Sequence, residues 1–290
     1  MKISVIIVAY KSANILKRCL DSIAKYNDLG DELEVIVVDN SPEGFRVQSE
    51  IEKSNYKNFK YIAADNKGFG AGNNIGAKVA GGEILAFLNP DIILIEPIFK
   101  GIYQEFLQDS KVEMLGVKLL YEDMKIGFSF YYDYKYSILK KQMQKIRNKI
   151  GKFDSKNMYI AGADMFVRKK TFFDVGMFDE NIFMYYEEPD LTRRIRNYNN
   201  ESKIEFCNKY KMIHLEKKST PQSLNVLDYE FDSAIYYGKK YGLDYKKKIQ
   251  FEMNYIELKK RIYRLIQNKE KEEKLEEQIG YLKMKYGKYK

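Results

Sequence analysis

The first ninety residues alternate between short apolar runs and a helical repeat of apolar positions. Residues 3–9 (ISVIIVA) form an uninterrupted apolar run, and a run of this length predicts a buried strand. Ser12 precedes a segment with helical spacing, so we expect it to cap a helix. The apolar positions of this helix are Ile15, Leu16, Cys19, Leu20 and Ile23. Residues 33–38 are a second apolar run, closed by turn-forming residues at 39–42.

Two further strands extend this pattern. Residues 61–64 predict a third strand and residues 84–88 a fourth, with a glycine-rich loop and a short helix between them. This alternation is typical of an α/β fold with a Rossmann-like, mostly parallel, twisted sheet flanked by helices. Asp39 follows the second strand and Asp91 follows the fourth, so both are expected at one edge of the sheet. Ligands bind at that edge in open α/β sheets, which makes Asp91 a candidate for holding a metal ion or a diphosphate.

The glycine-rich loop does not match the best-known nucleotide motifs. Gly68 and Gly70 are followed by Asn73 where a dinucleotide-binding loop has its third glycine. The chain also lacks the G-x-x-x-x-G-K-[ST] phosphate loop. Hydride transfer and P-loop phosphoryl transfer therefore lose their main support, and a plain glycine-rich turn before a helix stays open as an interpretation of this segment.

The second half of the chain is less regular. Residues 111–127 show no clear period, but residues 138–150 predict a helix with a stripe of apolar side chains. This stripe consists of Leu139, Met143, Ile146 and Ile150. Basic residues fill the positions between them, and no acidic residue occurs between Tyr134 and Lys152. Such a helix can lie in an anionic membrane interface, or it can pack its stripe on the protein with its lysines in water.

An acidic stretch follows among aromatic residues at 176–191. It contains the carboxylates Glu180, Glu187, Glu188 and Asp190. Pro189 suits the first turn of a helix, which would place Glu187 or Glu188 at the positive amino end of the helix dipole. A carboxylate ionised in this way can act as a general base, although ordinary helix capping would explain the same residues.

Cysteine and histidine usage is sparse. Cys19 and Cys207 lie far apart without a C-x-x-C spacing, which predicts neither a disulfide framework nor a zinc site and suits a reducing compartment. The one histidine of the chain, His214, follows the apolar-rich residues 210–213 and is either structural or a metal ligand. The amino terminus lacks a signal-peptide pattern, and no apolar stretch approaches the roughly 18 residues of a membrane span. We therefore expect a cytoplasmic protein.

The net charge of +9 is concentrated at the end of the chain. Residues 239–290 carry 16 Lys and Arg against 8 Asp and Glu, and the preceding residues carry 34 against 33. A neutral body with a basic tail favours an anionic partner, although a solvated lysine-rich helix has the same composition. No nucleic-acid-binding module is recognisable, so we expect no nucleic-acid partner. Residues 226–290 are expected to form a helical carboxyl-terminal extension.

Five sequence blocks, taken in order from Lys2 to about Ser219, resemble the inverting family 2 glycosyltransferases of GT-A fold. The resemblance is strongest to the bacterial rhamnosyltransferase-like branch. The blocks are VIIVAYKS, VIVVDNS, NKGFGAGNNIGAKVAGGEILAFLNPD, the acidic stretch preceded by GADMFVR, and His214 five residues before Ser219. This resemblance implies a GT-A catalytic domain over residues 1–225, with a nucleotide-binding half (1–92) and an acceptor half (93–225).

The resemblance also implies roles for individual residues. Asp39 would bind the uracil or thymine ring, in a base pocket shaped by Ala9 and Tyr10. Asp91 would hold Mg²⁺ or Mn²⁺ on the diphosphate, and His214 would complete the metal or diphosphate site. The remaining residues implied to lie near the nucleotide sugar are Asn66, Gly68, Asn74 and Asn89.

Two departures from the family pattern stand out. Asn89 replaces the first aspartate of the family's D-x-D motif, which leaves fewer charged metal ligands. The usual E-D-x-D pattern has become Glu187-Glu188-Pro189-Asp190, so Glu188 takes the position of the general base. Its extra methylene displaces the carboxylate, and a misplacement of ~1 Å can cost about a hundredfold in rate, which keeps Asp190 as a rival.

The implied activity is inverting transfer of a sugar, of rhamnose, galactofuranose or hexose type, from a dTDP- or UDP-sugar. The acceptor would be a saccharide, polyprenyl-linked in the resembled branch, in bacterial surface polysaccharide synthesis. The alternative is a non-catalytic nucleotide-sugar-binding or assembly subunit of a membrane-associated polysaccharide complex. The basic segments add an anionic surface on the inner face of the cell membrane as an expected partner, and the oligomeric state stays open, with a homodimer as one option.

Overall fold

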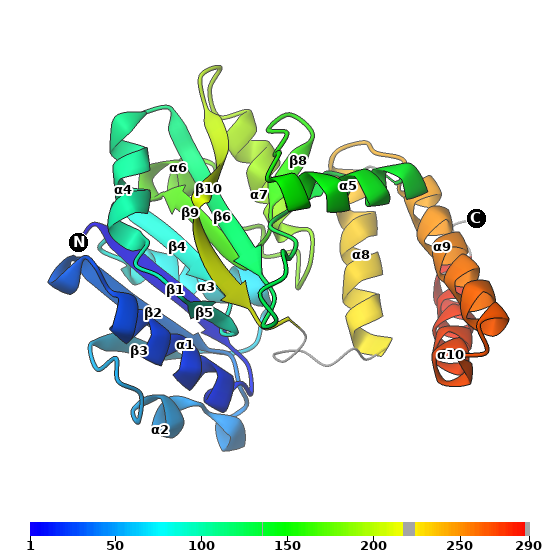
Figure 1. Cartoon of the computed structure of the whole chain (residues 1–290), viewed down its shortest axis with the longest axis horizontal. Helices are drawn as coiled ribbons and strands as arrows, with labels where there is room; N and C mark the ends of the chain where they lie inside the picture. Colours follow the sequence, from blue (N-terminus) through cyan, green and yellow to red (C-terminus); the bar gives the residue numbers. More distant parts are fainter. Residues whose placement is uncertain (135, 217–223, 288–290) are drawn as a thin grey trace. The chain divides into compact units, whose positions relative to one another are not determined.

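The computed structural model describes residues 1–134, 136–216 and 224–287. The chain divides into two compact units (Figure 1). One unit comprises Met1–Asp133 and Gln144–Pro221, and the other comprises Tyr134–Met143 and Gln222–Lys290. The first unit contains the sheet that carries the candidate site.

Within the described residues, the first unit has an eight-stranded sheet in the order β3-β2-β1-β4-β9-β6-β10-β5. Strands β3, β2, β1 and β4 are mutually parallel, and β6 and β10 are also parallel to each other. The bounds are β1 Ile3–Ala9, β2 Leu33–Asp39, β3 Phe59–Ala63, β4 Ile84–Leu88, β5 Ile92–Leu94, β6 Val112–Leu120, β9 Asp164–Arg168 and β10 Lys203–His214. This architecture confirms the predicted α/β fold with a mostly parallel sheet.

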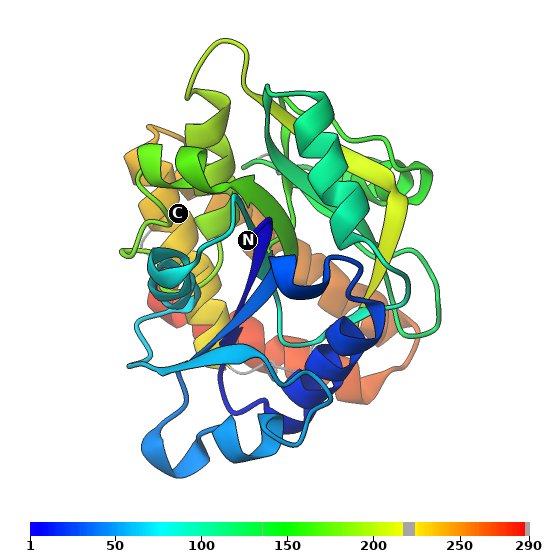
Figure 2. The same ribbon diagram turned by 90° about the vertical axis from the view of Figure 1, so that its left-hand side faces the viewer.

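Helices cover both faces of the sheet, and each face has its own apolar core. Figure 2 shows α1 and α4 on one side of the strands, and α3 and α7 on the other. The first core takes in residues of α1 and α4, and the second takes in residues of α3, α6 and α7. The helices of this unit are α1 Ala13–Tyr26, α2 Gln48–Ile51, α3 Phe69–Val79, α4 Phe99–Gln108, α6 Lys169–Asp174 and α7 Glu187–Arg196, with short 3₁₀ turns at Gly30–Glu32 and Glu43–Phe45.

The central strands form where the sequence predicts them because their residues are apolar on both faces. All seven residues of β1 and all seven of β2 are buried, as expected for parallel strands covered by helices on both sides. Helix α1 begins directly after Ser12, as predicted. The expected cap bond is absent, however, because Ser12 Oγ is buried without a hydrogen-bond partner among the described residues.

The pairing of strands brings the candidate residues to one edge of the sheet. Ala9 at the end of β1 is in register with Asp39 at the end of β2, and Ile7 is in register with Leu88 at the end of β4. Strand β9 runs antiparallel to β4, so that Asp164 at its beginning lies opposite Leu88. The prediction that the second and fourth strands end at the same edge is therefore confirmed.

A smaller sheet and one helix complete the region between β6 and β9. Strands β7 (Phe130–Tyr132) and β8 (Met158–Ile160) pair in antiparallel fashion. Helix α5 (Ile138–Ile150) lies between them in the chain and matches the range predicted for the cationic amphipathic helix.

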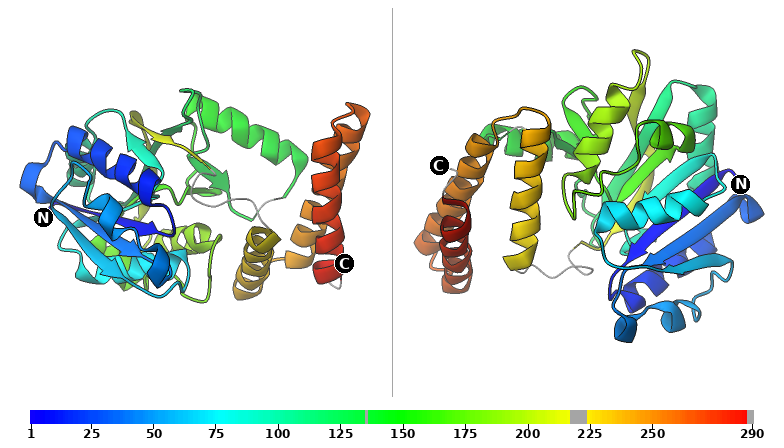
Figure 3. Two further views of the ribbon diagram at one scale, coloured as in Figure 1. Left: turned by 90° about the horizontal axis from the view of Figure 1, so that it is seen from below. Right: turned by 180° about the vertical axis from the view of Figure 1, so that it is seen from behind.

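The carboxyl-terminal unit is helical, as the sequence predicts. Its helices are α8 Leu224–Lys240, α9 Tyr245–Leu265 and α10 Lys269–Tyr286. Helices α9 and α10 lie side by side (Figure 3). Ile262, Leu265 and Ile266 are exposed. None of the helices in the described segments combines the length and apolar character needed to cross a lipid bilayer.

Candidate active site

Asp91 and His214 come together from two different strands at the edge of the sheet. His214 is in register with Ile92 because β10 pairs antiparallel with β5. The amide of Leu215 donates to the carbonyl oxygen of Asp91 at 3.0 Å. The Asp91 side chain is buried, and its Oδ1 lies 3.3 Å from Nε2 of His214. The two residues expected to bind the metal therefore lie close together.

The chemistry of this pair fits a divalent cation with further ligands from elsewhere. A carboxylate oxygen and an imidazole nitrogen form a donor set that Mn²⁺ accepts, whereas Mg²⁺ prefers oxygen alone. Within the described segments, no group of three or more His, Cys, Asp or Glu side chains is arranged to hold a metal by itself. An ion at Asp91 and His214 would therefore keep coordination positions open for substrate oxygens and water.

Asp39 is fixed at the end of β2 by three hydrogen bonds. Its Oδ1 accepts from the amide of Ser41 at 2.9 Å, and its Oδ2 accepts from the amide of Val47 at 2.8 Å and the hydroxyl of Tyr61 at 2.6 Å. Burial and this carboxylate raise the pKa of Tyr61 well above its usual range. A carboxylate has about four acceptor positions. At most one therefore stays available for the ring N–H of a pyrimidine.

The end of β1 presents one buried and one exposed residue. Ala9 is buried, whereas the neighbouring Tyr10 is 43% exposed. Lys11 has a left-handed backbone conformation, with φ of 52°. Its Nζ lies 5.3 Å from the ring centre of Tyr10 and 4.5 Å from that of Phe45. This edge therefore combines aromatic rings with a cation next to Asp39.

The glycine-rich loop packs against the acidic stretch. Gly68 has φ of 108°, and a Cβ there would clash with the backbone of Phe183, so this position needs glycine. Asn66 is exposed, and its Oδ1 accepts from the amide of Gly68 at 3.3 Å.

Asn74 ties helix α3 to the same stretch. Its side-chain amide bonds both backbone groups of Phe178, at 2.9 and 3.0 Å, and Oε1 of Glu180 at 3.0 Å. The structure therefore gives Asn74 a positioning role, and its contact with the nucleotide stays a prediction. Asn89 is half-buried after β4, and its amide donates to the carbonyl oxygen of Ala163 at 3.2 Å.

Glu188 lies in the first turn of α7, as Pro189 predicted. Glu188 is half-buried as a residue, but its carboxyl group is surrounded by protein atoms, and this desolvation raises the pKa of Glu188 to about 7. The backbone N–H groups of Glu188 and Gly162 oppose that rise. A Cβ on Gly162 would overlap the carboxyl end of Glu188, so a larger residue there would displace this side chain. Glu188 therefore exchanges its proton near neutral pH.

The two neighbouring acids, Glu187 and Asp190, have different surroundings. Glu187 is buried, and burial together with the charge of Glu188 holds the pKa of Glu187 well above its usual range. Asp190 is closed to solvent, and its Oδ2 lies 2.8 Å from Nε and 2.7 Å from Nη2 of Arg194. Of the three acidic residues in this turn, Glu188 is the one that is not fully buried.

The backbone that presents Glu188 is strained. Tyr185 and Tyr186, which directly precede α7, have φ of 67° and 73°. Left-handed conformations cost residues with a side chain roughly 1–2 kcal/mol each. Consecutive strained residues of this kind are typical of functional loops. No local sequence signal marks these positions, because tyrosine is not a usual left-handed residue.

Several residues of the site are missed by sequence reasoning. Tyr131 and Tyr159 stack with ring centres 5.8 Å apart, and burial followed by the charge of Glu188 raises the pKa of Tyr159. Burial also holds the pKa of Asp164 well above its usual range, while its Oδ2 accepts from the amide of Val117 at 2.9 Å. The GADMFVR segment carries Asp164, so that motif could have drawn attention to it.

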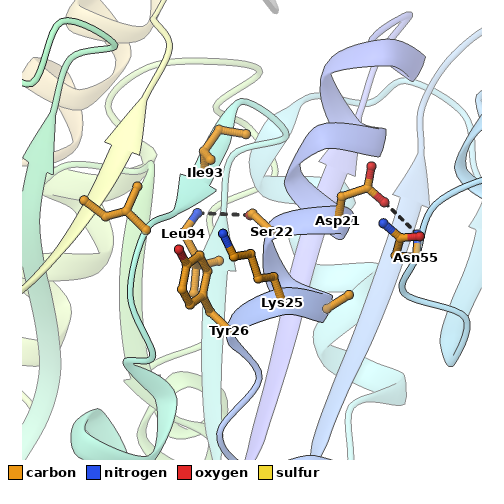
Figure 4. Close-up of a pocket in the computed structure, with 9 residues that line it drawn as sticks. Asp21, Ser22, Lys25, Tyr26, Asn55, Ile93 and Leu94 are labelled. Atoms are coloured by element: carbon orange, nitrogen blue, oxygen red, sulfur yellow. Dashed lines mark hydrogen bonds between the residues drawn. The ribbon is translucent and has the colours of Figure 1, made fainter.

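A separate hollow lies beside α1 and β5. It has a volume of about 650 Å³ and is lined by Asp21, Ser22, Ala24, Lys25, Tyr26, Asn55, Ile93, Leu94 and Ile95 (Figure 4). None of the predicted site residues lines it. Its polar groups bond to one another, since the amide of Leu94 donates to Ser22 Oγ and the amide of Asn55 to Asp21. We therefore assign the site to the sheet edge, where the carboxylates and the histidine converge.

Comparison with known proteins shows to which family the chain belongs. The profile described as Glycosyl transferase family 2 matches residues 4–173, which is more than half of the chain. The chain belongs to this family. EpsH of Bacillus subtilis (strain 168), which is named as a glycosyltransferase, is 32% identical over 94 residues. That match covers 31% of this chain and 26% of EpsH.

Solved glycosyltransferase structures share the fold. TarS of S. aureus is similar with a TM-score of 0.54 and 18% identity, over 81% of this family 2 chain and 39% of TarS. GalNAc-T7, solved with UDP, GalNAc and Mn²⁺, is similar with a TM-score of 0.59 and 15% identity, over 82% of this chain and 48% of the other. These similarities establish the GT-A fold. The chain spans about a quarter of EpsH and less than half of these two structures.

Ser219, the end of the resembled region, lies outside the described residues. The predicted residues Ala9, Tyr10, Asp39, Asn89, Asp91 and His214 all lie at the sheet edge or directly after it. The family 2 chain therefore has a coherent set of candidate groups, with Glu188 on an adjoining helix.

Proposed function

We propose that the chain is an inverting glycosyltransferase that moves a sugar from a dTDP- or UDP-sugar to a saccharide hydroxyl. One connected arrangement carries this proposal. The carboxyl group of Glu188 packs against Gly162, and the next residue, Ala163, accepts the hydrogen bond of Asn89. Asn89 is two residues before Asp91, which lies beside His214. The proposed base and the proposed metal-binding pair are thus linked through a few backbone atoms.

The chemistry of a direct displacement needs a base, charge stabilisation and alignment. Glu188 in its deprotonated form takes the proton of the acceptor hydroxyl. Asp91 and His214 hold the diphosphate end of the donor, where a bound Mn²⁺ or Mg²⁺ would neutralise charge on the leaving group. Asp39 and Tyr10 orient the base of the nucleotide. No covalent intermediate is required, so the anomeric configuration inverts.

Turnover of labelled nucleotide sugars tests this proposal. Full-length protein should convert a UDP- or dTDP-sugar to free nucleotide diphosphate in a Mn²⁺- or Mg²⁺-dependent reaction, with transfer to a saccharide acceptor. Asp91→Ala should abolish turnover and weaken the metal-dependent part of diphosphate binding, because it removes the buried carboxylate beside His214. Unchanged metal-dependent affinity in Asp91→Ala would overturn the assignment of the metal site. Tight donor binding without turnover would favour the non-catalytic assembly subunit.

We further propose a catalytic domain over residues 1–225 with a basic extension over 226–290. The acceptor would be a saccharide on a polyprenyl lipid, in bacterial surface polysaccharide synthesis, and the chain would belong to the rhamnosyltransferase-like branch. The support is the resemblance of the five blocks and the basic character of the tail. Comparing lipid-linked and free acceptor saccharides tests this, and equal use of both would contradict it.

A further inference from the structure

Helix α5 leaves its apolar stripe exposed to solvent. The exposed fractions are 70% for Leu139, 38% for Met143, 60% for Ile146 and 61% for Ile150. Sequence reasoning allowed this stripe to pack on the protein with the lysines in water. The structure contradicts that alternative, because the apolar side chains are the ones that face water. Exposing four large apolar side chains in a row is unfavourable unless something else covers them.

The polar side of α5 is the side that packs on the protein. Asn148 is buried, and its Oδ1 accepts from the amides of Ser129 at 2.8 Å and Phe130 at 3.2 Å. Its Nδ2 donates to the carbonyl oxygen of Phe130 at 3.0 Å. One turn earlier, Oε1 of Gln144 accepts from the amide of Tyr132 at 3.1 Å.

These bonds fix the rotation of the helix about its axis. A rotation that buried Ile146 and Ile150 would break the bonds of Asn148 and leave buried backbone amides without acceptors, at a cost of roughly 1–3 kcal/mol each. An amphipathic helix on a protein surface normally has the opposite orientation, with its apolar side inward. The outward direction of the stripe is therefore built into the fold.

The charged side chains of α5 itself are all positive. Lys145 and Lys149 are exposed on the same side of the helix, and no acidic residue occurs between Tyr134 and Lys152. Nζ of Lys141 forms an ion pair with Oε2 of Glu252 at 2.9 Å, so we leave Lys141 out of the charged surface. An apolar stripe flanked by lysines is complementary to the headgroup region of an anionic bilayer.

We propose that α5 docks this chain on an anionic lipid bilayer, with Ile146 and Ile150 buried among the headgroups and Lys145 and Lys149 on the lipid phosphates. A second copy of the chain is a poorer occupant. A symmetric dimer through this face would bring the lysines of both copies together. The inference is independent of the glycosyltransferase assignment, because it rests on the orientation of one helix.

Sedimentation with vesicles tests the proposal on the full chain. Phosphatidylcholine vesicles containing phosphatidylglycerol should pellet the protein, and pure phosphatidylcholine vesicles should not. The double variant Ile146→Ser and Ile150→Ser should reduce partitioning by about tenfold or more, since it removes apolar area from the interface. Lys145→Glu with Lys149→Glu should reduce it similarly and remove its dependence on salt.

A matched control lies on α9. Ile262→Ser with Leu265→Ser also removes two exposed apolar side chains, 48% and 81% exposed, and should leave partitioning unchanged. All variants change exposed positions, so their melting temperatures should match that of the parent. Equal pelleting of the Ile146/Ile150 variant, or equal binding to neutral vesicles, would overturn the proposal. A concentration-dependent dimer that this variant abolishes, without vesicle binding, would identify a second copy as the occupant.

Discussion

Glu188 and Asp190 are separated by two positions, yet their surroundings give them different capabilities. Glu188 is half-buried, whereas Asp190 is fully buried and paired with Arg194. Glu188→Gln should keep the fold and donor binding but lower kcat by about 10²-fold or more, the usual cost of losing a positioned base. Steady-state kinetics would measure the loss of kcat, and donor titrations would show that the affinity for the donor is unchanged.

The matched control is Asp190→Asn. Losing the partner of Arg194 should lower the free energy of unfolding, because a buried guanidinium then loses its charge-assisted bond. We expect a lower melting temperature with a smaller effect on kcat. A loss of kcat in Asp190→Asn equal to that predicted for Glu188→Gln, at unchanged stability, would make Asp190 the base.

The pKa of Glu188 also predicts two pH profiles. A base must be deprotonated, so kcat should rise as pH increases to about 7 and then level off. The carboxyl group binds its proton more tightly in the folded chain than in the unfolded chain, where the pKa is about 4.3. Its contribution to stability is therefore present below that value and is lost as pH rises to about 7.

Glu188→Gln supplies the test of both profiles. The variant should lose the acidic limb of the rate profile and flatten the stability change between about pH 4.3 and 7. Rates and denaturant midpoints measured across this range would check the assignment. An acidic limb that persists unchanged in the residual activity of the variant would show that another group titrates.

At the level of helices and strands, local pattern predicted some elements well and others poorly. Strands β1 and β2 are continuous apolar runs with turn residues behind them, and α1 has a clear helical repeat, so their local sequence is sufficient. Strand β6 is also buried on both faces, but it lies in the 111–127 region, where charged residues interrupt the apolar run. The position of antiparallel β9 between β4 and β6 depends on long-range pairing, which no local spacing encodes.

The residues of the candidate site were also predictable from the sequence only in part. The sequence indicated Asp91, His214 and Glu188 because each follows or begins a recognisable element. It could not indicate that Asp39 already accepts three hydrogen bonds, or that Asn74 is committed to Phe178 and Glu180. Those facts depend on side chains far apart in the chain. Likewise, periodicity located the stripe of α5, but a few hydrogen bonds of its polar side decide which way the stripe faces.

Asn148 is therefore the residue on which the orientation of α5 depends. Asn148→Ala should lower the free energy of unfolding by about 2–4 kcal/mol, because the amides of Ser129 and Phe130 lose their acceptor. Urea denaturation would measure the change. Gln142→Ala, at an exposed position of the same helix, is the control and should change stability by less than about 0.5 kcal/mol. Equal effects of the two substitutions would show that Asn148 does not anchor the helix.

At the scale of the whole molecule, the basic charge of the carboxyl-terminal unit is partly neutralised within that unit. Lys260 lies 2.9 Å from both Glu257 and Glu276, and Arg264 lies 2.6 Å from Glu272. A count of lysines along the tail therefore overstates the charge it can offer to an anionic surface. The expectation that the basic residues 239–290 also contact an anionic surface is therefore weaker than the proposal for α5.

Ligand binding offers a test that the whole molecule reports. A ligand that binds only the folded chain raises its stability, by about 2.7 kcal/mol at a hundredfold excess over Kd. UDP or dTDP should therefore raise the melting temperature by several degrees, and more with Mn²⁺ than without it. ADP should raise it less, because adenine in a nucleotide has no ring N–H to donate to the remaining acceptor position of Asp39.

Variants separate the two contributions to this shift. Asp91→Ala should remove the additional increment due to Mn²⁺ and retain the preference for pyrimidine. Asp39→Ala should remove the preference and retain the increment, and its own melting temperature should be lower because Ser41 and Val47 lose an acceptor. The comparison is therefore made as the ligand-induced shift within each variant. Equal shifts with purine and pyrimidine diphosphates in the parent chain would contradict a base pocket at Asp39, whatever the outcome at Asp91.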